Sequence, residues 1–389
     1  MKILIVSYNK FPMNDAGAIR EYNFGKIFKR LNFSAHFLGM GNTEYNQKCS
    51  TKDGIKYTSL RLKGKTLAIK IKNYFFHYKR LMKKLKEFEK LDKVLVIDIP
   101  IMSLLKLKKY CKKNSIELIH DSVEWYSASQ FTLRFFAPSY IKKSLYNNYL
   151  IDKKIKVISI STFLNNHFLK KGIKSIRVPI LFDVRELIES KEINKDKKLN
   201  LLYAGSPGKK DYLKEILYAL TLLNESELKK VKMIILGVSL DEVKKIFIKD
   251  TVSMKKISKI LEIRGRVPRE KVIIELLKSD FTVLLRDPLK RYAKAGFPSK
   301  VVESLCHGVP IITNYSSDLN MYLKDNINSI IVKGCTSLDF YESLKKAMEL
   351  KKMDLKKMKK NARKTGLENF DLEKYQGILK FFLESYDDE

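Results

Sequence analysis

A turn and helix start late in the chain carry the residues best suited to bind a phosphorylated ligand. Gly296 and Phe297 precede a proline, Ser299 is the expected helix cap, and Lys300 lies in the first turn. Exposed amides and the positive end of the helix dipole favour a diphosphate at such a place. A cation in the first turn opposes the dipole, and a bound anion would remove that conflict. The alternative is an ordinary capped helix.

Glu303 follows one turn later on the same predicted helix. A carboxylate has two acceptor oxygens, so it suits the two hydroxyl groups of a ribose. Gly308 ends the helix, and Pro310 stands where a buried strand begins. A solvent-facing glutamate on an ordinary helix is the competing interpretation.

Further cations follow two predicted strands of the same half. Gly205 ends a strand over 200–203 and is followed by Lys209 and Lys210. Lysines at a strand end could neutralise the charge of a bound phosphate group, so Lys209 and Lys210 are candidate ligands of an anion. Arg286 follows another strand and could supply a second cation. Simple solvation of these side chains is the alternative.

Polar residues also follow two predicted strands in the N-terminal half. Gly17 lies after the first strand, where a missing side chain lets the backbone approach a ligand. His120, Asp121 and Glu124 end another strand. Asp121 or Glu124 is a candidate general base or a group that positions a hydroxyl, and His120 is a candidate to hydrogen-bond a ligand. The alternative is a polar strand end with Asp121 as a helix cap.

The elements that must position these residues alternate along the whole chain. Short apolar runs, of the kind that buried parallel strands require, are separated by amphipathic helical patterns. The strands are predicted over 2–7, 34–39, 93–97, 116–120, 157–160, 200–203, 232–236, 262–264, 281–285, 309–313 and 329–332. This order predicts an α/β protein with two doubly wound parallel sheets, whose ligands bind at the carboxyl ends of the strands.

Four segments follow from the same pattern. We predict an N-terminal domain over 1–180, a polar linker over 181–198, a C-terminal domain over 199–368, and a C-terminal helix over 369–389 that packs back toward the first domain.

The charge of the chain is strongly positive. Lysine and arginine number 77 against 43 acidic residues, a formal net charge of +34. Residues 61–90 concentrate eleven of these cations, with aromatic residues interleaved at 74, 75, 76 and 78. No recognised nucleic-acid fold accompanies them, so no nucleic-acid partner is expected. A helical pattern over 67–91 predicts one helix, which either packs its aromatic residues into the first domain or lies on an anionic membrane.

The cysteines and the N-terminus give no sign of a metal site, a signal peptide or a membrane span. Four cysteines, at 49, 111, 306 and 335, lack metal-ligand or redox spacing, and no Asp-x-Asp triplet of the metal-binding kind stands out. We therefore expect no metal ion and no other cofactor. The N-terminus lacks the features of a signal peptide, and no apolar run approaches the ~20 residues that span a bilayer. The expected location is the cytoplasm, with the inner face of the plasma membrane as a further site.

The stretch Ala295–Thr313 resembles the signature of family 4 retaining glycosyltransferases of GT-B fold. Glu303 matches the second of that signature's two glutamates, and Gly308–Pro310 matches its Gly-x-Pro. Ala295 stands where the first glutamate is expected, and in this the chain resembles a capsule and lipopolysaccharide subgroup that lacks it. Ser206 stands where that family commonly has an arginine. The resemblance implies that Lys210 is the lysine that neutralises charge on the departing nucleotide, an electrostatic catalyst rather than a proton donor. It also implies that Gly17 lets the first loop approach the donor phosphates or the acceptor.

The family often has a residue at the place of His120, Asp121 and Glu124 that touches the donor sugar or activates the acceptor hydroxyl. The resemblance therefore makes 1–180 the acceptor domain and 199–368 the donor domain.

The resemblance implies a GT-B architecture of two Rossmann-like domains that face a cleft. It also implies a nucleotide-sugar donor held mainly by the C-terminal domain, retention at the anomeric carbon and no requirement for a metal. The expected function is sugar transfer to a glycan or lipid-linked acceptor in surface polysaccharide synthesis. The alternatives are a GT-B-like sugar-nucleotide epimerase or hydrolase, and a non-catalytic protein that binds membrane or nucleic acid.

Overall fold

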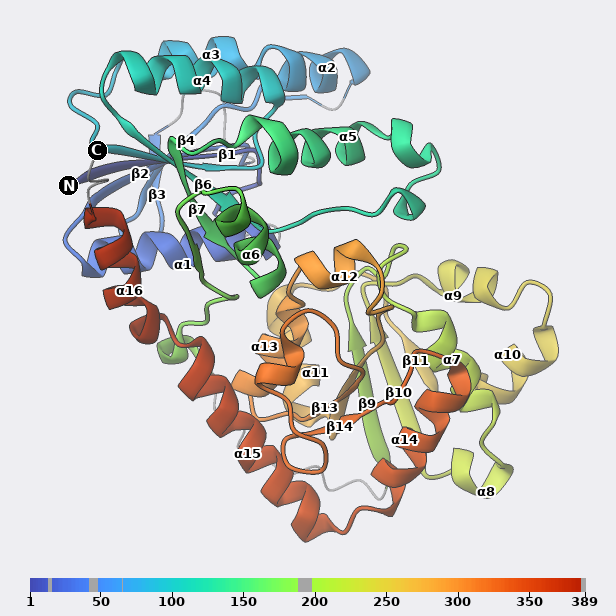
Figure 1. Ribbon diagram of the computed structural model, residues 1–389. Helices are drawn as coiled ribbons and strands as arrows, with labels where there is room; N and C mark the ends of the chain where they lie inside the picture. Colours follow the sequence, from blue (N-terminus) through green and yellow to red (C-terminus); the bar gives the residue numbers. More distant parts are fainter. Residues whose placement is uncertain (13–15, 42–47, 65, 188–197, 386–389) are drawn as a thin grey trace. The chain divides into compact units, whose positions relative to one another are not determined.

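The chain forms two units, which we describe from a computed structural model of residues 1–12, 16–41, 48–64, 66–187 and 198–385. The first unit comprises Met1–Leu181 and Leu372–Glu389, and the second comprises Phe182–Asp371 (Figure 1). Most of the linker predicted over 181–198 lies outside the described residues.

The first unit is built on an eight-stranded sheet in the order β3-β4-β2-β1-β5-β6-β7-β8. Every strand pair is parallel except β3 with β4. The chain moves outward from β1 to one edge and then from β5 to the other, so the strand order reverses between β1 and β5. The strands are β1 (Lys2–Ser7), β2 (Ser34–Gly39), β3 (Lys48–Ser50), β4 (Lys56–Ser59), β5 (Lys93–Ile97), β6 (Glu117–Ser122), β7 (Ile155–Ser159) and β8 (Ser175–Arg177).

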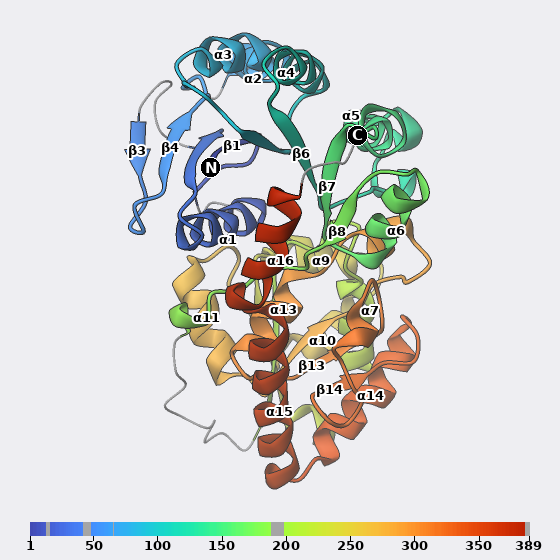
Figure 2. The same ribbon diagram turned by 60° about the vertical axis from the view of Figure 1, so that its left-hand side comes forward.

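Helices cover both faces of this sheet because successive strand residues point to opposite faces. Ile3 and Ile5 of β1 pack with helices α1 and α16, whereas Leu4 and Val6 pack with α3 and α4. Figure 2 shows α16 beside α1. The helices are α1 (Ala16–Arg30), α2 (Leu67–Phe75), α3 (His77–Leu85), α4 (Ile101–Lys113), α5 (Pro138–Leu145), α6 (Thr162–Lys170) and α16 (Leu372–Glu384).

The second unit is built on a six-stranded parallel sheet in the order β11-β10-β9-β12-β13-β14. Its strand order reverses between β9 and β12. The strands are β9 (Leu199–Ala204), β10 (Val231–Leu236), β11 (Leu261–Ile263), β12 (Phe281–Leu284), β13 (Ile311–Thr313) and β14 (Ser329–Ile331).

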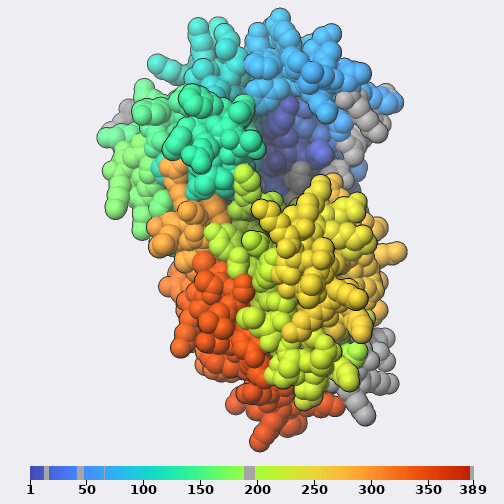
Figure 3. All heavy atoms as spheres, turned by 90° about the vertical axis from the view of Figure 1, so that its right-hand side faces the viewer, coloured from blue at the N-terminus to red at the C-terminus, as the bar shows by residue number. Residues whose placement is uncertain are grey.

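The main core of the second unit lies under α7, which packs between α10 and α14 (Figure 3). A smaller apolar cluster on the other face includes Leu276 of α11. The helices are α7 (Leu213–Thr221), α8 (Glu225–Leu228), α9 (Leu240–Ile246), α10 (Thr251–Ser258), α11 (Arg269–Lys278), α12 (Arg291–Ala295), α13 (Ser299–Cys306), α14 (Ser337–Glu349) and α15 (Lys352–Phe370).

The predicted fold class, two doubly wound α/β sheets, is confirmed. Sequence patterns missed β3, β4 and β8, which are three or four residues long and carry polar residues that mask any apolar run. The single helix expected over 67–91 is wrong, because Phe76 leaves helical geometry and separates α2 from α3. No helix among the described residues has the length and apolar character needed to cross a membrane.

Candidate functional site

Two glycines at the carboxyl end of the second sheet open the space for a lysine. Gly205 follows β9 with φ +142°, and a Cβ atom there would lie 2.9 Å from Nζ of Lys300. Gly237 follows β10, and its Cβ atom would lie 2.8 Å from the carbonyl oxygen of Gly205. Side chains at these positions would therefore push Lys300 or the loop away from the strand end.

Lys300 and Arg286 converge on a single carboxylate, that of Asp211. Nζ of Lys300 lies 2.6 Å from Oδ2 of Asp211, and Nε of Arg286 lies 2.9 Å from Oδ1. The hydroxyl of Tyr203 donates a further hydrogen bond to Oδ2 at 2.9 Å. The Asp211 side chain is 3% exposed, whereas Arg286 and Lys300 are 12% and 21% exposed. We call Asp211, Arg286 and Lys300 the second-unit triad.

The triad carries a formal net charge of +1. Burial would raise the pKa of Asp211, but Lys300 and Arg286 outweigh it and hold that pKa below its usual value. Burial lowers the pKa of Lys300, and Asp211 partly restores it. The Lys300 ammonium also lies over the Tyr203 ring, 4.3 Å from its centre. Because the Asp211 carboxylate is buried and the two cations are the more exposed groups, the triad favours an anionic ligand.

Lys300 also lies in the first turn of α13, where backbone amides are open. Pro298 occupies the capping position and Ser299 is the first helical residue, so the predicted Ser299 cap is wrong. The amide of Gly296 donates to the carbonyl of Tyr292, at 3.0 Å. Among the described residues, the amides of Phe297, Ser299 and Lys300 have no protein acceptor. Three free donors therefore accompany the cations of the triad.

Glu303 lies one turn further along α13. Its Oε1 atom forms an ion pair of 3.0 Å with Arg269, and the side chain is partly exposed. Arg269 begins α11 directly after Pro268, and sequence analysis did not single it out. Pro268 marks a helix start in the sequence, and this is the local signal that could have drawn attention to Arg269.

Lys209 and Lys210 stand in the turn before Asp211. Lys209 is exposed and Lys210 is half-buried, and the carbonyl oxygen of Lys210 accepts a hydrogen bond of 3.0 Å from the Tyr292 hydroxyl. The amide of Asp211 donates to the carbonyl of Pro207, at 3.2 Å. This turn directs Asp211, rather than either lysine, into the strand end.

Helix α15 fixes the position of α13 from behind. Gly366 lies toward the C-terminal end of α15, and a Cβ atom there would be 2.5 Å from the amide nitrogen of Cys306. The two helices therefore approach each other backbone to backbone, as Figure 2 shows. The open amides of α13 thus belong to a helix that is tightly packed at its other end.

Asp121 in the first unit is engaged by protein groups. Arg20 binds its carboxylate bidentately, with Nη2 2.8 Å from Oδ1 and Nε 2.9 Å from Oδ2. The same guanidinium donates to the carbonyls of Val178 and Pro179, and both side chains of the ion pair are buried. This arrangement leaves Asp121 no open face for a substrate and argues against a general-base role.

The other predicted residues of the first unit are dispersed. His120 is buried beside Tyr146, and burial lowers its pKa to about 3, so its imidazole is neutral. Glu124 is half-buried and accepts a hydrogen bond from the Tyr126 hydroxyl. Gly17 lies in α1, where a Cβ atom would be 2.5 Å from Nδ2 of Asn9. The glycine therefore makes room for a protein side chain.

A family model decides the class of protein to which this site belongs. Residues 184–365 match the family described as glycosyl transferases group 1. The match spans the triad, the start of α13 and Glu303. This protein is a glycosyltransferase.

The fold of the glycosyltransferase is similar to several solved structures over nearly its whole length. Sucrose-phosphate synthase from Thermosynechococcus elongatus shares 10% identity at a TM-score of 0.77, over 97% of each chain. WaaG, a glycosyltransferase involved in lipopolysaccharide biosynthesis, shares 14% identity at a TM-score of 0.71, over 99% of this chain and 100% of that one. Anabaena HepE in complex with UDP and glucose shares 12% identity at a TM-score of 0.69, over 99% and 100%. No curated protein sequence matches the chain.

These likenesses identify the architecture as GT-B and confirm that part of the prediction. The two units of the glycosyltransferase are the two Rossmann-like domains of that fold. Retention, the subgroup without the first glutamate and the roles of individual residues stay predictions.

Proposed function

We propose that this glycosyltransferase moves a sugar from a nucleotide-sugar donor to a glycan or lipid-linked acceptor in surface polysaccharide synthesis. The reaction proceeds with retention and without a metal ion. The observation that carries the proposal is that Lys300 shares the first turn of α13 with open amides, while Arg286 joins it through their common partner Asp211.

The diphosphate of the donor binds at the start of α13. Lys300 uses one of its N–H donors on Asp211, and Arg286 uses its Nε, so further donors of both side chains remain for phosphate oxygens. Because Asp211 already holds both cations in place, little side-chain entropy is lost when the ligand binds. The same groups stabilise the charge that develops on the departing nucleotide, with Lys209 and Lys210 as additional cations.

Glu303 binds the ribose of the donor. Arg269 fixes its Oε1 atom, and the partly exposed carboxylate retains Oε2 for hydroxyl donors. The complex of HepE with UDP supports a nucleotide of this class. Ala295 offers no carboxylate near the sugar, so the backbone at Gly296 and Phe297 contacts the sugar or its phosphate instead.

The first unit binds the acceptor near the loop after β1 and near Glu124. Its surface also fits an anionic membrane at the cytoplasmic face. Helix α2 turns Leu67, Ile71 and Phe75 outward, each 45% or more exposed, and exposed Lys70 and Lys72 lie among them. An apolar stripe flanked by cations is the pattern of a helix that lies in a lipid headgroup layer.

A thermal-shift panel of nucleotide sugars tests the proposal, because a ligand of the native state raises the unfolding midpoint. Glu303→Ala and Lys210→Ala should each lower the rate of transfer by about 10- to 100-fold while the fold stays intact. Lys245→Ala, at an exposed position of α9, is the matched control. Full activity in both site variants would remove the site assignment.

The same assay separates the alternatives. An epimerase or hydrolase should turn over the donor without an acceptor, whereas the proposed transferase requires one. A non-catalytic binding protein should show no saturable shift with any nucleotide sugar.

A further inference from the structure

Asp98 occupies the position in the first unit where a doubly wound sheet binds ligands. It directly follows β5, which lies beside β1 at the reversal of strand order. Ligands of such sheets bind outside the carboxyl ends of the strands at this reversal. Asp98 also has φ +49°, a left-handed conformation that few residues other than glycine adopt. No predicted site residue of the first unit stands at this strand end.

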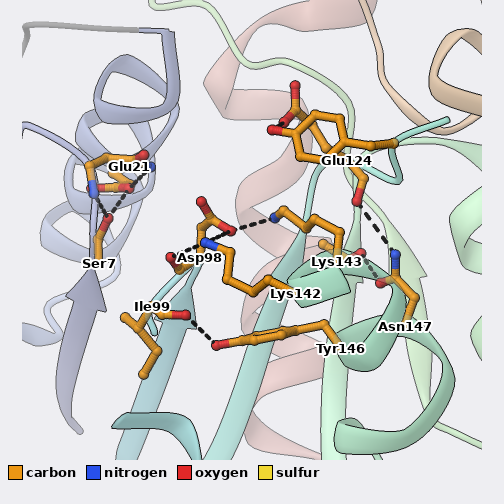
Figure 4. A network of polar contacts seen from close by, with 12 residues as sticks. Ser7, Glu21, Asp98, Ile99, Glu124, Lys142, Lys143, Tyr146 and Asn147 are labelled. Carbon is orange, nitrogen blue, oxygen red and sulfur yellow. Dashed lines mark hydrogen bonds and ion pairs between the residues drawn. The ribbon is translucent and has the colours of Figure 1, made fainter. Parts of the chain in front are cut away.

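Two lysines of α5 hold one oxygen of this carboxylate. Nζ of Lys142 lies 3.0 Å and Nζ of Lys143 lies 2.7 Å from Oδ1 of Asp98. The lysine side chains are 11% and 4% exposed, whereas Asp98 is 29% exposed. Figure 4 shows that the second oxygen of Asp98 is turned away from both lysines. We call Asp98, Lys142 and Lys143 the first-unit triad.

The lysines keep the Asp98 carboxylate ionised. Burial would raise the pKa of Asp98, but Lys143 and Lys142 outweigh it and hold the pKa below its usual value. An ionised carboxylate accepts stronger hydrogen bonds than a neutral oxygen does. The exposed oxygen of Asp98 is therefore suited to accept a hydrogen bond from a hydroxyl group.

The surroundings favour a neutral ligand over an anion. Glu124 lies close enough to Lys143 to raise the pKa of that lysine, so two carboxylates balance the two lysines. Across the reversal, the Ser7 hydroxyl donates to the Glu21 carboxylate at 2.5 Å (Figure 4). Glu21 is buried and bound by protein groups, so the carboxylates that remain at least partly exposed here are those of Asp98 and Glu124, and their oxygens match the hydroxyl donors of a sugar.

We propose that the outward oxygen of Asp98 accepts a hydrogen bond from a hydroxyl group of the acceptor sugar, which is uncharged where it meets this residue. The inference rests on the proposed function and adds to it the residue that binds the acceptor and the chemical class it recognises. Lys142 and Lys143 act as positioning residues behind it.

The test is an NMR titration of the full chain, in the presence of UDP, with methyl glucoside, methyl galactoside and methyl mannoside. Asp98→Asn should weaken the binding of the preferred glycoside by about 10- to 100-fold, the loss expected for one hydrogen bond to a charged group. Asp152→Asn is the matched control, because Asp152 pairs with Lys108 at 2.7 Å before β7, away from the strand ends. The UDP affinity should be unchanged in both variants.

A second variant keeps the test decisive if the unpaired lysines unfold Asp98→Asn. Asp98→Glu retains the charge but displaces the carboxylate, and it should show the same loss of glycoside binding. Unchanged glycoside affinity in the folded variants would overturn the inference, as would a wild-type chain that binds none of the glycosides. Binding of glucose 6-phosphate alone, dependent on Lys142 and Lys143 but not on Asp98, would also overturn it. If neither UDP nor any nucleotide sugar binds, the proposed function is contradicted instead. The nucleotide titration measures this separately from glycoside binding.

Discussion

Both units place two cations and one carboxylate at the carboxyl ends of their strands, but they differ in which of these groups is exposed. Each has one aspartate and two cations where its strand order reverses. In the second unit the aspartate is buried and the cations are the more exposed groups. In the first unit both lysines are buried and the aspartate is the more exposed group.

The difference teaches that composition does not decide which ligand a charged cluster binds. Each triad has the same formal charge, so its preference depends on which member reaches solvent and keeps open hydrogen-bonding capacity. Outward cations suit a diphosphate, whereas an outward carboxylate suits hydroxyl groups.

The largest expected difference between the two units is the extent to which acid lowers their stability. Burial lowers the pKa of His36 to about 4 and those of His77 and His120 to about 3, all in the first unit. Below pH 6.5, the ordinary pKa of histidine, these histidines are protonated in the unfolded chain but stay neutral in the folded one. The free energy of unfolding therefore falls as the pH drops from 6.5 toward 4. At pH 5 each histidine should cost about 2 kcal/mol.

Hydrogen exchange resolved along the chain measures this effect unit by unit. The first unit should lose protection at a higher pH than the second, whose only described histidine is His307. His77→Gln, which can keep the bond to Ser103, should reduce the acid sensitivity of the first unit. Equal loss of protection in both units would contradict the prediction.

Removing one cation from each triad should affect UDP affinity in one unit but not in the other. Lys300→Met deletes an outward cation and should weaken UDP binding by about 30- to 100-fold, because a charged hydrogen bond to phosphate is lost. Lys143→Met deletes an inward cation of the other unit and should leave UDP affinity unchanged. Isothermal titration calorimetry measures both, and equal losses would show that only total charge matters.

The smallest expected effect concerns the exposed apolar surfaces of the two units. Ile71→Glu on α2 should lower binding to phosphatidylglycerol vesicles by about 5- to 10-fold, because one apolar side chain no longer enters the headgroup layer. Val252→Glu, at an exposed position of α10 in the second unit, should have no effect. Vesicle sedimentation at low and high salt measures both. Binding to phosphatidylcholine that matches phosphatidylglycerol would count against the membrane contact.

Sequence patterns predicted the sheets well because buried parallel strands are continuous apolar runs. The predicted limits of β1, β2 and β5 agree with the structure. Lys300 and Arg286 were predicted as ligand-binding cations, but the aspartate that joins them was not, because Asp211 and Lys300 are 89 positions apart in the sequence. The first-unit triad was not predicted for the same reason, since Asp98 and Lys142 are 44 positions apart. The sequence also does not show that Asp121 pairs with Arg20, 101 positions away. The alternation of side chains along a strand gives the face on which a residue lies, but not the residue that it contacts there.

Gly366 sets a limit on how this enzyme can be made more robust. Glycine inside a 19-residue helix loses about 1 kcal/mol of helical propensity relative to alanine. An engineer who replaces it to stiffen α15 would drive a methyl group into the backbone of α13 near Cys306. The close approach of two backbones, rather than helical propensity, therefore determines which residue this position accepts.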